Sequence, residues 1–256
     1  MELRGFMGGI YRLTEWIMRL AFINLLWLAF SLFAPVFLLI VLYAFDPTVV
    51  DKGFYFQTFM LVGIVAPFTL FPATSAMFAI VRKFVQGADD SPMFRTFFKG
   101  FKENYLKSMI AGILFVITCF LIYFNYNFYS LQEGNLKLLS YLFLVLTVIV
   151  IITICYYFCF IVHIEAKFTR LIKNSLMMTI GNPVGSLVIL FGNVVILYFS
   201  YFQFTFLVLF FTGSMMAFLT YFMFQRGFDK MIAKVEAMQN KEAAANEELE
   251  VKNEPN

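Results

Sequence analysis

The stretch FPATSAMFAIVRKFVQGADDSPMFRTFFKGFKENYLKS, residues 71–108, connects two runs of apolar sequence. It begins as an apolar segment with a proline and small residues, breaks at 87–92, and then mixes phenylalanine with lysine and arginine. At helical spacing, the segment 92–106 presents an aromatic face and a basic face. These faces consist of Phe94, Phe97, Phe98 and Phe101 on one side and Arg95, Lys99 and Lys102 on the other. Such a helix lies at a membrane surface, so 92–106 is predicted to contact anionic lipid headgroups.

The composition of the whole chain supports a membrane setting. The 256 residues are 61% hydrophobic and only 14% charged, with a mean hydropathy of +0.81. Soluble domains are about 45–50% apolar and about 25% charged, so this chain has too few polar side chains to cover a soluble surface. The cysteines, Cys119, Cys155 and Cys159, all lie inside apolar runs, and no disulfide framework is expected.

The apolar runs predict an all-α, polytopic transmembrane bundle with about six spans. A span needs about 20 mostly apolar residues, and the candidates are 20–45, 54–81, 108–128, 139–162, 187–202 and 206–225. The last two come from the single run 187–224, which we split at SYFQFT (200–205); one long tilted helix or a re-entrant segment is the alternative.

Amphipathic segments complete the predicted membrane domain, residues 1–235. Interfacial helices are expected at 5–19, 92–106 and 166–179, each before a transmembrane hairpin. The tail 236–256 is rich in glutamate and lacks aromatic residues, so it is predicted to be disordered.

Basic residues predict the orientation of this bundle. With both termini in the cytoplasm, every lysine and arginine except Lys52 and Lys137 lies on the inner side. A five-span arrangement would place the C-terminal cluster of basic residues outside. Because cytoplasmic segments carry an excess of lysine and arginine, six spans with both termini cytoplasmic are favoured.

Several residues within the spans are predicted to serve helix packing. Asn24 can form a hydrogen bond across helices, and Trp27 can anchor the first span. Prolines interrupt the first two spans, and small residues follow the last of them; this set is Pro35, Pro67, Pro72, Ala73 and Ala76. A broken helix lining a substrate cavity is the alternative interpretation.

The sequence contains no constellation typical of an enzyme. It has no glycine-rich phosphate loop, Ser-His-Asp set or HExxH motif, so no catalytic activity is expected. Cys155, Cys159 and His163 are spaced four apart and could bind copper or zinc. However, three ligands along one straight helix converge poorly, so no metal or cofactor is expected. Nucleic acid is not expected either, because the basic face of 92–106 is paired with an aromatic face.

Three motifs resemble the YesL-like family of bacterial integral membrane proteins, whose function is unassigned. They are LAFINLLWLAFSLFAP at 20–35, FPATSAMFAIVRK at 71–83 and FFKGFKENYLKS at 97–108, with Tyr105 where phenylalanine is more usual. The resemblance covers about residues 5–110. It implies a multi-pass protein of the bacterial cell membrane and, because family members are often encoded beside sugar ABC-transporter components, a role near carbohydrate uptake. It implies no catalytic or binding residues.

Two functions are therefore expected. The first is a non-catalytic accessory protein associated with an ABC-type carbohydrate uptake system, with transporter subunits or a second copy of the chain as partners. The alternative is a permease for a small uncharged solute such as a sugar. Its pathway would use polar residues of the spans, namely Gln57, Thr69, Asn125, Asn127, Asn193 and Gln203. Spans almost without ionisable residues disfavour active transport by this chain alone.

Overall fold

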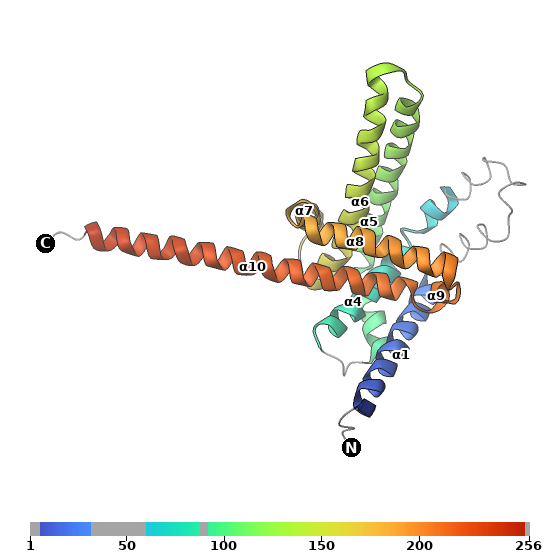
Figure 1. Ribbon diagram of the computed structural model, residues 1–256, viewed down its shortest axis with the longest axis horizontal. Coiled ribbons are helices and arrows are strands. Elements are labelled where there is room, and N and C mark those ends of the chain that lie inside the picture. The colour runs from blue at the N-terminus through green and yellow to red at the C-terminus, as the bar shows by residue number, and fades with distance from the viewer. Residues whose placement is uncertain (1–5, 32–59, 88–91, 254–256) are drawn as a thin grey trace, which may run out of the picture.

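A computed structural model describes residues 6–31, 60–87 and 92–253, and every regular element in these ranges is helical (Figure 1). The elements are α1 (Phe6–Phe30), α4 (Leu70–Val85), α5 (Met93–Ser130), the 3₁₀ turn η1 (Gly134–Lys137), α6 (Leu138–His163), α7 (Phe168–Gly181), α8 (Pro183–Tyr198), the π-helical turn η2 (Phe199–Gln203), α9 (Phe206–Phe210) and α10 (Thr212–Asn253). The predicted all-α class is confirmed for the described residues.

Helix α4 lies at the centre of the molecule, in contact with α1, α5, α6 and α10 (Figure 1). Small residues on α5, facing α4 and the turn before it, allow the two helices to come close. A Cβ on Gly100 of α5 would lie 2.8 Å from the Cβ of Ala79, and one on Gly112 would lie 2.9 Å from the Cα of Pro67. Small residues at a helix interface permit this close approach, which gives α4 and α5 their extensive contact.

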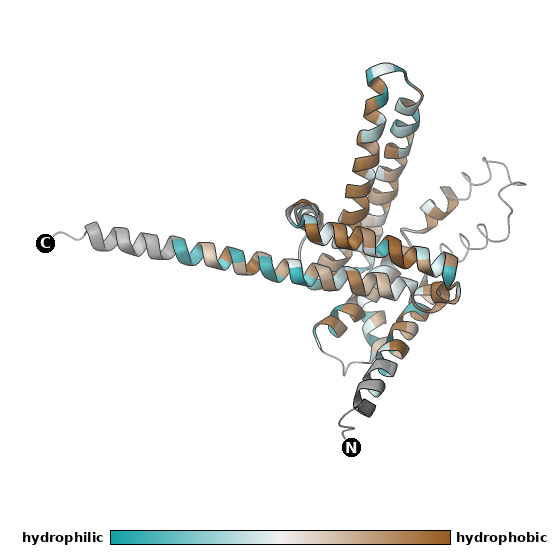
Figure 2. Cartoon of the chain, viewed as in Figure 1, coloured by the Kyte–Doolittle hydropathy of each residue, from teal (hydrophilic) through white to brown (hydrophobic). Residues whose placement is uncertain are grey.

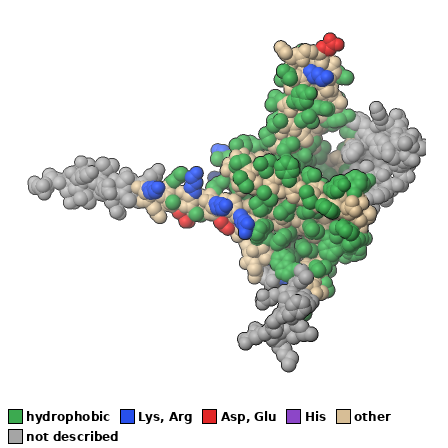
Figure 3. Space-filling model, in the orientation of Figure 1, with side chains coloured by type: hydrophobic (Ala, Val, Ile, Leu, Met, Phe, Trp, Pro, Cys, Tyr) green, Lys and Arg blue, Asp and Glu red, His purple; other side chains and the backbone are tan. Residues whose placement is uncertain are grey.

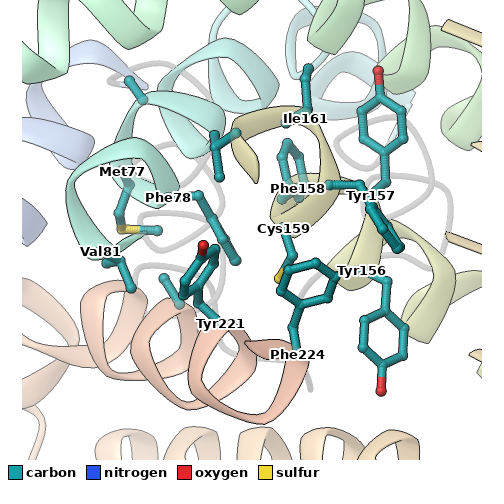
Figure 4. Close-up of a cluster of buried hydrophobic side chains, with 14 of the residues drawn as sticks. Met77, Phe78, Val81, Tyr156, Tyr157, Phe158, Cys159, Ile161, Tyr221 and Phe224 are labelled. Atoms are coloured by element: carbon teal, nitrogen blue, oxygen red, sulfur yellow. The ribbon is translucent and has the colours of Figure 1, made fainter. Parts of the chain in front are cut away.

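The core of the protein forms where α4, α6 and α10 meet (Figure 4). Phe78 of α4 stacks on Phe158 of α6 with ring centroids 5.7 Å apart. Phe160 of α6 meets Phe224 of α10 edge to face at 4.8 Å. Aromatic pairs in these geometries are favourable beyond the area they bury. The central core is therefore aromatic and draws on distant parts of the sequence.

Two helical hairpins extend from this core. α5 and α6 form a hairpin that projects from the body and is apolar along most of its length (Figures 1 and 2). α8 and α10 form the second, which runs crosswise to the first (Figure 1). The chain reverses between α8 and α10 at residues 199–211, which includes the turn predicted at 200–205.

Three helical segments of the described chain are long and apolar enough to cross a membrane: Met93–Ser130, Gly134–His163 and Pro183–Gln203. These segments agree with a membrane protein, but six spans are not confirmed. The predicted spans 20–45 and 54–81 lie partly outside the described residues.

Two predicted boundaries differ from the structure. The interfacial helix 92–106 and the span 108–128 form one continuous helix, α5, and α1 likewise runs through the predicted division at residues 19–20. Neither junction contains glycine or proline, so nothing in the local sequence ends the helix.

Most of the tail that was predicted to be disordered, 236–256, lies within α10. α10 continues to Asn253 as a helix that extends away from the body (Figure 1). The tail is rich in alanine, glutamate and lysine. These are strong helix formers, so a segment that cannot bury a core can still continue an existing helix.

Candidate functional site

A polar cavity of about 690 Å³ lies between the C-terminal ends of α4 and α6 and the first half of α5. Its charged and polar lining comprises Arg82, Lys83, Gln86, Thr96, Lys99, Glu103, Asn104, Lys107, His163 and Glu165. Ala79, Gly100 and Ile161, Val162 and Ile164 complete the wall. A polar hollow of this size against an otherwise apolar bundle is the best candidate for a functional site in the described part of the chain.

Helix periodicity brings one stripe of α5 to the cavity. Thr96, Lys99, Glu103 and Lys107 are separated by three or four residues and therefore share a face. Within the stripe, the ammonium of Lys99 lies 3.7 Å from the carboxylate of Glu103. Both side chains are largely exposed, so this pair contributes little to stability.

The opposite wall is fixed by hydrogen bonds from the end of α4. A guanidinium nitrogen of Arg82 donates to the carbonyl oxygen of Val162, in the last turn of α6. Nζ of Lys83 lies 3.1 Å from Oγ1 of Thr96, at the start of α5. These bonds hold the ends of three helices together, and the cation at the C-terminal end of α6 also complements the helix dipole.

His163 connects the cavity to α10. Its Nδ1 lies 2.8 Å from the hydroxyl of Tyr221, whose oxygen also accepts a hydrogen bond from Nε2 of Gln86 at 3.5 Å. α6 ends at His163, and the following residues are extended. For this reason Glu165 can reach the same cavity, although residues two apart would diverge on a helix.

The residues predicted to face the membrane surface fall into several environments. Among the basic residues, Lys99 lines the cavity, whereas Arg95 and Lys102 are exposed outside it. Among the aromatic residues, Phe94 is exposed, but Phe97 is fully buried. The rings of Phe97, Phe98 and Phe101 all lie within 5.0–5.6 Å of Phe30 on α1. Most of the aromatic face therefore packs against protein, because α1 covers it.

Asn24 and Trp27 lie in a buried polar cluster between α1, α4 and the α9–α10 break. Nδ2 of Asn24 donates to the carbonyl of Leu209 at 2.7 Å, and its Oδ1 accepts from the backbone N–H of Ser214 at 3.1 Å. The indole N–H of Trp27 donates to Oγ1 of Thr74 at 3.0 Å. Asn24 thus satisfies backbone groups that the helix break leaves without helical partners.

The proline-rich region is also a packing feature. Pro67 lies in a turn at 66–69 that separates helical residues 60–65 from α4. The hydroxyl of Tyr105 donates to the carbonyl of Phe68 in this turn at 3.3 Å. Pro72, Ala73 and Ala76 are buried within α4. Pro35 lies outside the described residues.

The described residues contain no group of histidine, cysteine and carboxylate side chains arranged to hold a metal ion. His163 instead interacts with Tyr221 and the rings of Phe224 and Phe228. Sequence reasoning missed the cavity, whose members lie on three helices. The spacing of Lys99, Glu103 and Lys107 was the one local signal that could have indicated a polar stripe on α5.

Together, the fold and the apolar helices define a helical integral membrane protein with a polar cavity at one end of its bundle. Residues 20–126 match the family model described as "Protein of unknown function, DUF624". The chain is 29% identical to the uncharacterized protein YesL of Bacillus subtilis (strain 168) over 210 residues, which cover 82% of this chain and 85% of YesL. These matches confirm the resemblance to the YesL-like family, whose function is unknown.

Two further relatives from the same organism are also uncharacterized. The chain is 27% identical to YteU over 181 residues, covering 71% of this chain and 68% of YteU. It is 28% identical to YesV over 131 residues, covering 51% and 63% respectively. No solved structure matches the chain significantly.

Proposed function

We propose that this chain is a non-catalytic integral membrane accessory protein of the bacterial cell membrane, associated with an ABC-type carbohydrate uptake system. The carbohydrate part of this proposal rests on the family resemblance found in the sequence. The accessory part is supported by the geometry of the polar cavity. We also propose that both termini lie in the cytoplasm.

The observation that carries the accessory role is that the cavity ends against a packed core. Ile161 and Val162 line the cavity, and Tyr157 and Phe158 in the preceding turn of α6 belong to the core; all four are buried. In the described residues, the cavity therefore does not continue between the helices toward the tip of the α5–α6 hairpin. A cavity without a continuation through the bundle fits a protein that binds a ligand or a partner better than a protein that conducts a solute across the membrane.

Polar residues expected along a solute pathway also fail to converge in the described chain. Asn125 and Asn127 donate to carbonyls of their own helix, and Asn193 donates to Thr220 of α10. None of them lines the cavity. Their hydrogen bonds support a structural role, which weakens the permease interpretation.

A permease for a small uncharged solute is the second candidate. One observation favours it: the turn at 66–69 interrupts a helical stretch within a predicted span, and broken helices form the binding sites of many transporters. Against it, the freed carbonyl of Phe68 already has a partner in Tyr105.

The test is purification of the tagged full chain from its native membrane in mild detergent, with identification of the proteins that accompany it. We expect stoichiometric recovery of transporter subunits. A solitary protein that takes up neutral sugars when reconstituted in liposomes would establish the permease instead.

A charge-reversal pair can locate the contact with the partner. Arg95→Glu combined with Lys102→Glu changes exposed basic residues outside the cavity and is expected to reduce recovery of the partner. Lys137→Glu, in the exposed turn at the opposite end of the α5–α6 hairpin, is the control and should leave recovery unchanged. Equal recovery with both variants would exclude the basic surface of α5 as the docking site.

A further inference from the structure

We propose that the polar cavity between α4, α5 and α6 binds a phosphate-bearing anion, supplied either by the headgroup of an anionic lipid or by a phosphorylated solute. This site is independent of the accessory role, because it rests on the composition and shape of the cavity alone. The two sources share one chemistry, a phosphate group that carries negative charge and several acceptor oxygens.

The charge of the lining favours an anion. Among the residues that the structure describes, four cationic residues line the cavity, against two carboxylates. The cations are Arg82, Lys83, Lys99 and Lys107, and the carboxylates are Glu103 and Glu165. A surface recess lined by an excess of one sign of charge attracts ions of the opposite sign, so this lining favours an anion.

The lining also supplies the donors that phosphate recognition requires. Lysine and arginine bind phosphate through charge-assisted hydrogen bonds, and neutral donors complete the coordination of its oxygens. Gln86, Thr96 and Asn104 provide such groups among the cations. The cavity volume of about 690 Å³ falls in the usual range for ligand sites, about 300–1,000 Å³, and leaves room for more than the phosphate itself.

The four cations do not have the same role. Arg82 and Lys83 already connect helix ends through Val162 and Thr96, so they form the rigid back of the site. Lys99 is largely exposed and forms an ion pair with Glu103 at 3.7 Å. Lys107 lies two turns further along the same stripe of α5. Lys99 and Lys107 are therefore the lysines that an entering anion would engage, and the ones to substitute.

The experiment compares two double variants of the purified full chain. Lys99→Gln with Lys107→Gln removes two charges from the cavity. Arg95→Gln with Lys102→Gln removes two charges from the same part of α5, outside the cavity, and is the matched control. One assay measures equilibrium binding of inorganic phosphate in neutral detergent. The other follows binding of dioleoyl-phosphatidylglycerol, against dioleoyl-phosphatidylcholine, by native mass spectrometry.

We expect the cavity variant to bind at least one probe about tenfold more weakly than the unmodified chain, the effect of losing charge-assisted contacts. The control variant should bind as the unmodified chain does. Binding of phosphatidylglycerol alone identifies a lipid headgroup as the source, and binding of phosphate identifies a solute. The proposal is overturned if neither probe binds saturably, or if both variants lose binding equally.

A third variant is expected to bind the probe more tightly, a result that misfolding would not produce. Glu103→Gln removes a carboxylate from the lining and frees Lys99 from its ion pair, without disturbing a buried contact. It should bind the same probe severalfold more tightly. Glu133→Gln, which changes an exposed carboxylate in the turn before η1, outside the cavity lining, should not bind the probe more tightly. Unchanged or weaker binding by Glu103→Gln would contradict an anion site.

Discussion

The centre of the molecule around α4 and the distal part of the α5–α6 hairpin, residues 118–150, are both apolar but are stabilised differently. Around α4, hydrogen bonds connect different helices, as between Trp27 and Thr74 or Ser108 and Ser75. In the distal hairpin, polar side chains bond to their own helix, as Asn127 does to Tyr123. Many of its large apolar side chains are exposed on its surface (Figure 3).

This difference shows where the sequence specifies tertiary structure. Around α4, glycine, alanine, serine and asparagine fix which helices meet and how closely. The distal hairpin needs only two helices whose surfaces are apolar enough to lie in the bilayer, because fluid lipid chains accommodate many side-chain shapes. The centre should therefore be sensitive to small substitutions, and the distal hairpin should tolerate them.

The largest expected contrast concerns two leucines. Leu171 of α7 belongs to the buried core cluster that includes α4 and is 0% exposed, whereas Leu121 of α5 is 56% exposed. Leu171→Ala should lower the free energy of unfolding by about 3 kcal/mol, because it leaves a cavity in packed surroundings. Leu121→Ala should cost less than about 0.5 kcal/mol. Unfolding by SDS in mixed micelles measures both, and equal losses would remove the distinction between the two regions.

A matched pair of asparagines gives the next contrast. Asn24→Leu should cost about 2 kcal/mol, because it leaves backbone groups of the α9–α10 break without partners. Asn127→Leu breaks only a bond within its own helix and should be close to neutral. The same unfolding assay applies. A tolerated Asn24→Leu would mean that the break is stabilised by something other than this side chain.

Glycine packing should show an intermediate effect. A Cβ at Gly112 would lie 2.8 Å from the ring of Phe71 and 2.9 Å from the backbone of Pro67, so Gly112→Ala should cost about 1.5 kcal/mol. At Gly181, the nearest atom to an added Cβ is the end of Met231, at 3.9 Å. Gly181→Ala should leave the midpoint of unfolding unchanged. If both variants unfold alike, α4 and α5 are not in the close contact described.

The smallest expected effect is the coupling between Ser75 and Ser108. Their hydroxyls lie 3.1 Å apart between α4 and α5, fully buried. A double-mutant cycle with alanine at both positions should give a coupling of about 0.6 kcal/mol, typical of hydrogen bonds between helices in membranes. Thr118 and Thr147 each bond to their own helix, so the corresponding cycle should give no coupling.

Apolar runs in the sequence predict the helical class and the membrane setting because each run carries its signal locally. The turn between α8 and α10 could also be placed, since SYFQFT interrupts a run too long for one span. The junctions within α1 and α5 could not be predicted correctly. A change from amphipathic to apolar character does not end a helix unless a breaking residue accompanies it.

The cavity could not be predicted because its residues come together only in the fold. Lys99 was identified for its charge, but its neighbours Arg82 and His163 lie on helices whose ends meet only through packing around α4. The contact of Phe97, Phe98 and Phe101 with Phe30 of α1 could not be predicted for the same reason. Amphipathic spacing shows that Phe97 needs an apolar partner, but not whether lipid or Phe30 of α1 supplies it.

The continuity of α5 has a mechanical consequence. Its 38 residues form one rod about 57 Å long, with the cavity near its beginning and the hairpin turn at its end. From Lys99 to Ser130 the lever arm is about 47 Å, so a tilt of about 5° at the cavity displaces the turn by about 4 Å. A small tilt of α5 at the cavity, which side-chain packing there can absorb, would thus move the hairpin turn by several ångströms.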